Sequence, residues 1–208
     1  MSDYVYDAFD TADRYRVPVM ILADGMLGQM MEPVVLPEPK NALPDKPWAT
    51  CGHKNQRAHN VVNSLYLTAD DLERLNVERF ARYEDIKRDE QRAETFLTED
   101  ADVVVVAFGA SARVARSAVV SAREAGIRAG LVRPITLWPF PTRALEATVG
   151  TAKAYLTVEM NMGQMVDDVR LVLAGRAPVE FYGRTGGVIP TPAEVLAKIR
   201  EINGKAGE

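Results

Sequence analysis

Polar residues follow the ends of predicted strands, which is where α/β proteins usually bind ligands. The predicted strand 103–108 leads into Gly109, Ser111 and Arg113, which offer a tight turn, a helix N-cap and a cation. Helix N-termini present free N–H groups and a positive dipole end, so this turn suits a phosphate or a carboxylate. An ordinary strand-to-helix turn also needs a glycine and a cap, so a purely structural role stays open.

Arg133 and Glu159 end the next two predicted strands, 127–133 and 154–160. We expect their side chains to meet at the carboxyl edge of the sheet as a charge-assisted pair. Such a pair either orients the loop that follows Arg133 or leaves Arg133 to bind an anion from a neighbouring domain.

A second turn, with Asn161, Gly163 and Gln164, follows Glu159 and repeats the strand-to-helix arrangement. Asn161 is available as a polar contact. From the residues alone the turn is a simple tight turn; an interface role is what resemblance to a known family implies for it.

The loop 135–141 places Trp138 and Phe140 among prolines, which makes it stiff. Large aromatic side chains of this kind often anchor interfaces. The competing interpretation is that they cover the core of their own domain.

Cys51, His53 and His59 are the only cysteine and histidines in the chain, and they fall within nine residues. Their spacing matches no common zinc motif, and a fourth ligand would have to come from Asp or Glu, so we expect exposed loop residues and no metal. The acidic pair at 167–168 is explained by the dipole of a helix that begins nearby.

The sequence contains no constellation typical of catalysis. Both histidines lie before residue 60, in a stretch without predicted strands or helices, so no Ser/His/Asp set is credible. Neither a phosphate-binding loop with lysine nor a Gly-x-Gly-x-x-Gly dinucleotide motif is present. The residues by themselves therefore establish no chemistry.

From residue 99 to 208 strands alternate with helices, which predicts a three-layer α/β/α domain with a mostly parallel sheet. The expected strands are 103–108, 127–133, 154–160 and 178–183, and the expected helices are 111–125, 141–149, 163–174 and 192–202.

A charged segment, 68–98, precedes this domain. Thr68 and Asp71 resemble a capping box and predict a helix that continues to about Leu97. Its apolar positions form a narrow stripe without a strict heptad, so packing along one partner surface is favoured over a short coiled coil.

The first 36 residues predict a helix followed by a buried strand, 19–23. One helix and one strand cannot form a core, so we expect neighbouring strands outside this sequence and a natural protein that extends beyond Met1. Residues 37–67 are expected to be a linker, because five prolines fall within 33–47.

The composition of the 208 residues fits a globular protein with an ordinary share of hydrophobic residues, 47%. The net charge of −4 divides unevenly: residues 1–102 hold 12 Lys/Arg against 20 Asp/Glu, and residues 103–208 hold 13 against 9. No basic stripe suggests nucleic acid, and no apolar run approaches the ~20 residues that span a bilayer. Without a signal peptide pattern, the cytoplasm is the expected compartment.

Three motifs together resemble a known family. They are Arg-Pro-Ile-Thr-Leu-Trp-Pro-Phe-Pro at 133–141, Glu-Met-Asn-Met-Gly-Gln-Met at 159–165, and Gly-Gly-Val-Ile-Pro-Thr-Pro at 186–192. They resemble the transketolase C-terminal-like domain in the α subunit of 2-oxoacid:ferredoxin oxidoreductases of the 2-oxoglutarate and 2-ketoisovalerate types. By the same resemblance, residues 1–36 look like the C-terminal remnant of a thiamine pyrimidine-binding domain.

The resemblance implies an enzyme that oxidatively decarboxylates a 2-oxoacid to an acyl-CoA and reduces ferredoxin. It implies a β subunit carrying thiamine diphosphate and Mg²⁺, an iron–sulfur cluster and coenzyme A in the full complex, and allows γ and δ subunits. None of these cofactors is expected to be bound by this chain alone, because the catalytic residues of the α subunit lie upstream in the family.

The expected role of the chain is therefore architectural: assembly into an oligomer and shaping of the active-site cleft, without turnover by the isolated chain. A different class of function is a stand-alone module that binds an anion or coenzyme A, or that dimerises. A fragment of transketolase without ferredoxin coupling is a third interpretation, which the motif at 133–141 argues against.

Overall fold

The structure is a computed structural model that describes residues 1–43 and 45–205. Its contacts divide the chain into two compact units. The first unit contains residues 1–23 and 30–86, and the second contains residues 24–29 and the chain from Lys87 onward.

The second unit is built on one five-stranded sheet. Its strands are β1 (Ala93–Phe96), β2 (Val103–Ala107), β3 (Ala129–Pro134), β4 (Ala154–Glu159) and β5 (Val179–Gly183), in the order β1-β3-β2-β4-β5. β1 is antiparallel to β3, and all other neighbours are parallel. The predicted α/β class with a mostly parallel sheet is confirmed.

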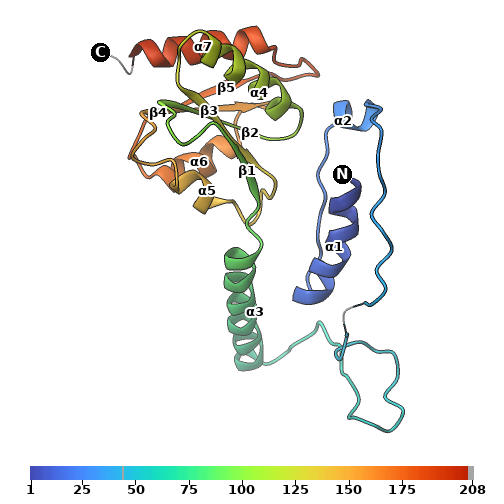
Figure 1. Ribbon diagram of the computed structural model, residues 1–208. Coiled ribbons are helices and arrows are strands. Elements are labelled where there is room, and N and C mark those ends of the chain that lie inside the picture. Colours follow the sequence, from blue (N-terminus) through green and yellow to red (C-terminus); the bar gives the residue numbers. More distant parts are fainter. Residues whose placement is uncertain (44, 206–208) are drawn as a thin grey trace. The chain divides into compact units, whose positions relative to one another are not determined.

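Helices cover both faces of this sheet (Figure 1). α4 (Gly109–Glu124) and α7 (Pro192–Lys205) pack on one face, and α5 (Thr142–Glu146) and α6 (Met165–Leu173) pack on the other. All five residues of β2 are buried, because a central parallel strand is covered on both sides.

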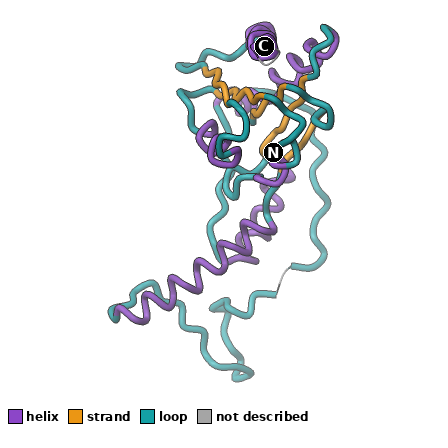
Figure 2. Tube along the Cα trace, turned by 90° about the vertical axis from the view of Figure 1, so that its left-hand side faces the viewer, coloured by secondary structure: helices purple, strands orange, loops and turns teal. Residues whose placement is uncertain are grey.

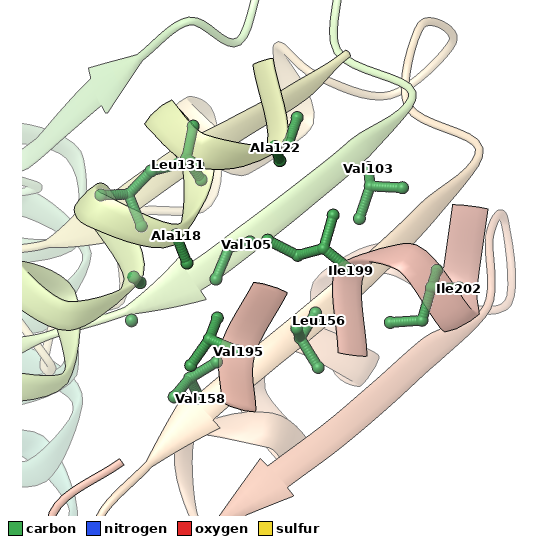
Figure 3. Packing of buried hydrophobic residues seen from close by; sticks show 14 of the residues in the cluster. Val103, Val105, Ala118, Ala122, Leu131, Leu156, Val158, Val195, Ile199 and Ile202 are labelled. Atoms are coloured by element: carbon green, nitrogen blue, oxygen red, sulfur yellow. The ribbon is translucent and has the colours of Figure 1, made fainter. Parts of the chain in front are cut away.

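The two cores follow the alternation of side chains along the strands. Val103 and Val105 face α4 and α7, whereas Val104 and Val106 face α5 and α6. Figure 3 shows Val105, Leu156 and Ile199 packed between the sheet and α7. The face of α4 that meets the sheet is mostly alanine, which lets the helix backbone approach closely: Ala112, Ala115, Ala118 and Ala122.

The first strand of the sheet was not predicted. The expected helix over 68–98 ends at Asp89, and β1 follows it as an antiparallel edge strand, with Glu94 opposite Arg133. Alanine and glutamate favour a helix over a strand, so pairing with β3 decides the conformation of β1. A Cβ on Gly130 of β3 would lie 2.5 Å from the Leu97 carbonyl oxygen, so the chain that leaves β1 passes very close to β3.

The first unit begins with α1 (Ser2–Tyr15). No strand is assigned at 19–23, and Met20 and Leu22 are exposed. The predicted strand was expected to pair with strands outside this sequence, so it stays a prediction. Among the described residues no strand lies alongside it, and an isolated strand leaves its N–H and C=O groups without a ladder. α2 (Gly25–Gln29) follows and belongs to the second unit.

Residues 30–67 contain no helix or strand among the residues described, and Figure 2 draws them as loop. Side chains tie this stretch to itself: Arg57 donates to the carbonyl oxygens of Ala49 and Gly52, and Asn60 donates to that of Pro47. The role of residues 37–67 as a linker stays a prediction.

α3 (Ala69–Asp89) starts one residue after Thr68, where the sequence predicted it. Thr68 Oγ1 donates to Asp71 Oδ2 over 2.6 Å, so the two residues meet through their side chains. At about 1.5 Å per residue the 21-residue helix is roughly 32 Å long, shorter than the roughly 45 Å of the predicted helix.

Candidate functional site

The carboxyl ends of β2, β3 and β4 form the candidate site, because neighbouring parallel strands end at the same edge of the sheet. Two helices start here: α4 two residues after β2 and α6 six residues after β4. Their first N–H groups have no partners within the helix and attract negative charge. What fills these two N-termini decides what the edge can bind.

Glu159 fills the N-terminus of α6. Its side chain is only 1% exposed, and its carboxylate accepts backbone N–H bonds from Gln164 at 3.2 Å, Met165 at 3.0 Å and Val166 at 3.0 Å. Asn161 Nδ2 donates a fourth bond over 3.0 Å. The carboxylate of Glu159 therefore occupies the place that an external anion would take.

The turn between Glu159 and α6 is shaped to hold this carboxylate. Asn161 Oδ1 accepts the backbone N–H of Gly163 over 2.7 Å, so the Asn161 side chain connects the turn to Glu159. Gly163 has φ of 107°, where side chains are strained, and an added Cβ would lie 3.1 Å from Val166 Cγ1. The predicted residues Glu159, Asn161, Gly163 and Gln164 do come together, although as a buried carboxylate network.

The predicted pair between Arg133 and Glu159 is wrong. Arg133 Nη1 donates instead to Glu94 Oε2 over 2.8 Å, across the β1–β3 pair. β2 lies between β3 and β4, so the strands that carry Arg133 and Glu159 are consecutive in the sequence but not adjacent in the sheet. The Arg133–Glu94 pair is partly exposed, which limits its contribution to about 1 kcal/mol or less.

The turn after β2 also differs from its prediction. α4 begins at Gly109, whose φ is 56°, and Phe108 occupies the N-cap position without a side-chain cap. Ser111 therefore lies inside the first turn, where it is 3% exposed, and is not the N-cap. Arg113 follows in the next turn of α4 and is exposed.

A carboxylate from a distant part of the sequence lies beside the start of α4. Asp24 Oδ2 is 3.4 Å from the position that a Cβ on Gly109 would take, and Leu27 Cδ1 is 3.8 Å from it. Asp24 Oδ1 also accepts the backbone N–H of Leu27 over 2.7 Å, which fixes the start of α2. Both long helices that start at this edge thus have a protein carboxylate near their N-termini.

The two large aromatic side chains of the loop 135–141 lie in different surroundings, one at the core and one in solvent. Phe140 is partly buried and packs against the core beneath α5 and α6, as the structural interpretation expects. Trp138 is 56% exposed, and its peptide bond to Pro139 is cis. The backbone N–H groups of Ile135 and Thr136 donate to the Arg92 carbonyl oxygen, so the segment before β1 holds the loop in place.

Two acidic residues, Asp167 and Asp168, lie in the first turn of α6 as expected. The pKa of Asp168 is raised above its usual value, first by burial and then by the negative charges of Asp167 and Glu159. The helix dipole favours acidic residues here, but the buried Glu159 already takes the best position.

The region of Cys51 gives no sign of a metal site within the described residues. The rings of His53 and His59 lie 3.9 Å apart between centroids, and Cys51 is exposed. No group of three or more His, Cys, Asp or Glu side chains is placed to hold a metal ion in residues 1–43 and 45–205. None of the described helices combines the length and the apolar character needed to cross a membrane.

The family model that matches this chain and two of its relatives carry the names of 2-oxoacid oxidoreductases or synthases, or of their subunits. The family described as "Pyruvate:ferredoxin oxidoreductase core domain II" matches residues 101–195. The chain is 43% identical to a ketoisovalerate oxidoreductase subunit VorB of Methanothermobacter marburgensis, over all of this chain and 59% of that protein. It is 31% identical to a 2-oxoglutarate synthase subunit KorA of Methanothermobacter thermautotrophicus, over 97% of this chain and 60% of that protein. The chain thus spans about three fifths of the length of these relatives.

A solved structure is similar in fold. It is a 2-oxoglutarate:ferredoxin oxidoreductase from Magnetococcus marinus with 2-oxoglutarate, coenzyme A and succinyl-CoA bound. The similarity has a TM-score of 0.55 at 20% sequence identity and covers 82% of this chain and 28% of that one.

Proposed function

The chain belongs to the family of 2-oxoacid:ferredoxin oxidoreductase α subunits, and from this premise we propose that it supplies a non-catalytic, assembling part of such an enzyme. The assembled enzyme would decarboxylate a 2-oxoacid oxidatively, form an acyl-CoA and reduce ferredoxin. This chain would dock against the subunits that bind the cofactors and shape the rim of their active-site cleft.

One observation carries the non-catalytic role: the N-terminus of α6 is filled by the carboxylate of Glu159. A site that bound a substrate carboxylate or a diphosphate at this helix would leave its N–H groups available. The neighbouring α4 has Asp24 at its first residue. The edge is therefore suited to protein contacts rather than to anionic substrates.

The cofactors of the reaction do not fit the donor groups of this chain. An iron–sulfur cluster usually takes about four thiolates, and the sequence has one cysteine. Mg²⁺ with thiamine diphosphate prefers several oxygen ligands, and the described residues offer no such group. We assign thiamine diphosphate, Mg²⁺ and the cluster to partner subunits or to other parts of the protein.

The substrate of the assembly is proposed to be a branched 2-oxoacid. The chain is 43% identical to the relative named for ketoisovalerate and 31% identical to one named for 2-oxoglutarate. Residues 1–36 would complete a pyrimidine-binding domain, residues 37–67 would connect it to α3, and the cytoplasm stays the predicted compartment.

The proposal is tested by 2-oxoacid-dependent reduction of a viologen dye without oxygen. The isolated chain should give no turnover, and the complex assembled with the partner β subunit and the complete α subunit should give turnover with 2-ketoisovalerate. Reduction of the dye by the isolated chain would refute the non-catalytic role. Faster turnover of the complex with 2-oxoglutarate would refute the substrate assignment alone.

Trp138 is the residue we propose as an anchor of the docking surface, because it is large, exposed and held in a stiff loop. Trp138→Ala should weaken association with the partner subunit at least tenfold, roughly the loss expected for an aromatic anchor. The control is Leu171→Ala, another exposed apolar residue, on α6. Equal affinity of the Trp138 variant and the control would show that the loop is not part of the interface.

A further inference from the structure

A second candidate site lies in the first unit, apart from the carboxyl edge of the sheet. It is a pocket of about 290 Å³, and its polar lining comes from α3, from the end of α1 and from the irregular stretch before α3. The polar residues that line it are Arg16, Asn63, Tyr66, Glu78, Arg79 and Arg82. The pocket thus brings together three guanidinium groups from two regions far apart in the sequence.

The positions along α3 explain why its two arginines share the pocket. Leu75, Glu78, Arg79 and Arg82 are spaced three and four residues apart, so they lie on one face of the helix. Among the described residues, neither Arg79 nor Arg82 has a hydrogen bond or ion pair. Two cations on the same helix face without partners repel each other, and an anion between them removes this cost.

The single carboxylate at the pocket is engaged elsewhere. Glu78 Oε1 accepts a hydrogen bond from Arg74 Nη1 over 3.0 Å. Arg74 does not line the pocket, and it forms ion pairs with Glu78 and Asp71. The three lining guanidinium groups therefore exceed the negative charge of the pocket.

The third arginine is held in place by an aromatic ring. Arg16 caps the end of α1 in a left-handed conformation, with φ of 53°. Its guanidinium carbon lies 5.1 Å from the ring centroid of Trp48, a cation–π contact. This contact restricts the Arg16 side chain at the pocket before any ligand binds, which lowers the entropic cost of binding.

We propose that this pocket binds a phosphate or diphosphate group of a small organic molecule. Guanidinium groups match phosphate oxygens in a forked geometry, and the charge of a phosphate, about −1.5 to −2 at neutral pH, suits the excess of cations. The Tyr66 hydroxyl and the Asn63 side chain add polar groups to the same lining. At about 290 Å³ the pocket is at the lower end of small-molecule sites, so it takes a head group and not a whole nucleotide cofactor.

The site is tested with inorganic diphosphate as the probe, by calorimetric titration of the full 208-residue chain. We expect one binding site per chain and affinity that falls as salt is raised. Arg79→Gln and Arg82→Gln should each weaken binding at least about tenfold, the effect of losing a hydrogen bond to a charged group. Arg88→Gln removes one positive charge from the same helix outside the pocket and should leave affinity within about twofold.

The outcomes separate the site from general charge attraction. Loss in both pocket variants but not in Arg88→Gln supports the proposal, provided that circular dichroism shows the same helix content in all variants. Equal weakening in all three would overturn it, as would no binding at millimolar diphosphate. Tighter binding of a polyglutamate peptide than of diphosphate, with the same dependence on Arg79 and Arg82, would also overturn it and assign the arginines to an acidic protein partner. None of these outcomes depends on the enzymatic role proposed above.

Discussion

The two candidate sites differ in whether their charged side chains have partners. At the carboxyl edge of the sheet, the buried carboxylate of Glu159 is fully engaged by three backbone N–H groups and one side chain. At the pocket of the first unit, Arg79 and Arg82 lack partners in the described part of the chain. A satisfied charge contributes to the fold, whereas a set of unsatisfied like charges costs stability and points to a ligand. Substitutions at the two sites should therefore have different effects on folding.

The largest effect is expected for Glu159→Ala. The substitution leaves three backbone N–H groups and Asn161 without their acceptor in a buried place, so the free energy of unfolding should fall by about 3–5 kcal/mol. Glu159→Gln keeps one acceptor oxygen and should lose about half as much. Denaturant titration measures both, with Glu180→Ala on an exposed position of β5 as the control. A loss below about 1 kcal/mol for Glu159→Ala would contradict the network.

A smaller effect is expected for Asp24→Ala. The substitution removes the acceptor for the Leu27 N–H, and loss of such a cap costs about 0.5–2 kcal/mol. Hydrogen exchange at Leu27 should become roughly five- to tenfold faster for a loss of about 1 kcal/mol. Asp24→Asn retains an acceptor oxygen and should protect this amide nearly as well. Unchanged exchange in the alanine variant would show that Asp24 does not hold α2.

Stability should hardly change when Arg79 and Arg82 are both replaced by Gln. Without partners to lose, the double variant should unfold within about 0.5 kcal/mol of the natural chain, and on the more stable side at low salt. Denaturant titration at two salt concentrations measures this. A loss of more than about 1 kcal/mol would mean that the guanidinium groups support the fold, and the contrast with Glu159 would fail.

The smallest effect is expected for Asp168→Asn. The raised pKa of Asp168 in the folded chain means that its ionised form disfavours folding. This cost appears as pH rises from the unfolded pKa, about 3.9, through the higher folded pKa, and it is absent below both values. The Asn variant should therefore gain stability relative to the natural chain at neutral pH and not at pH 3. Solvent screening of this exposed residue limits the gain to about 0.5 kcal/mol. Denaturant titrations at the two pH values measure it, and equal differences at both would contradict the assignment.

Most of the sheet could be predicted, because its central strands have local signals. The run of valines in β2 is buried on both faces, and the turns after β2 and β4 carry the glycines that short connections need. β1 could not be predicted, since Ala93 and Glu94 read as a continuation of α3 until β3 lies beside them. At 19–23 the situation is the opposite: the residues favour a strand, but no strand pairs with them within the described residues.

The candidate sites were less predictable than the fold. The turn at 161–164 was found from its position after a strand. That it holds the Glu159 carboxylate depends on the direction of the Glu159 side chain, which the spacing of residues does not reveal. Arg133 was assigned to Glu159 because strand order in the sheet cannot be read from order in the sequence. The pocket was missed because Arg79 and Arg82 look like an ordinary solvated helix face until Arg16 and Tyr66 are placed around it.

Glu159 is held mainly by the backbone, so the side chains on the turn between β4 and α6 are free to vary in evolution. Three of its four hydrogen bonds come from the backbone N–H groups of residues 164–166, and a backbone N–H is present whatever the side chain, proline excepted. The exposed side chains of Met162 and Gln164 can therefore be exchanged without disturbing the support beneath them. The surface at this edge can therefore change in sequence while the fold stays intact.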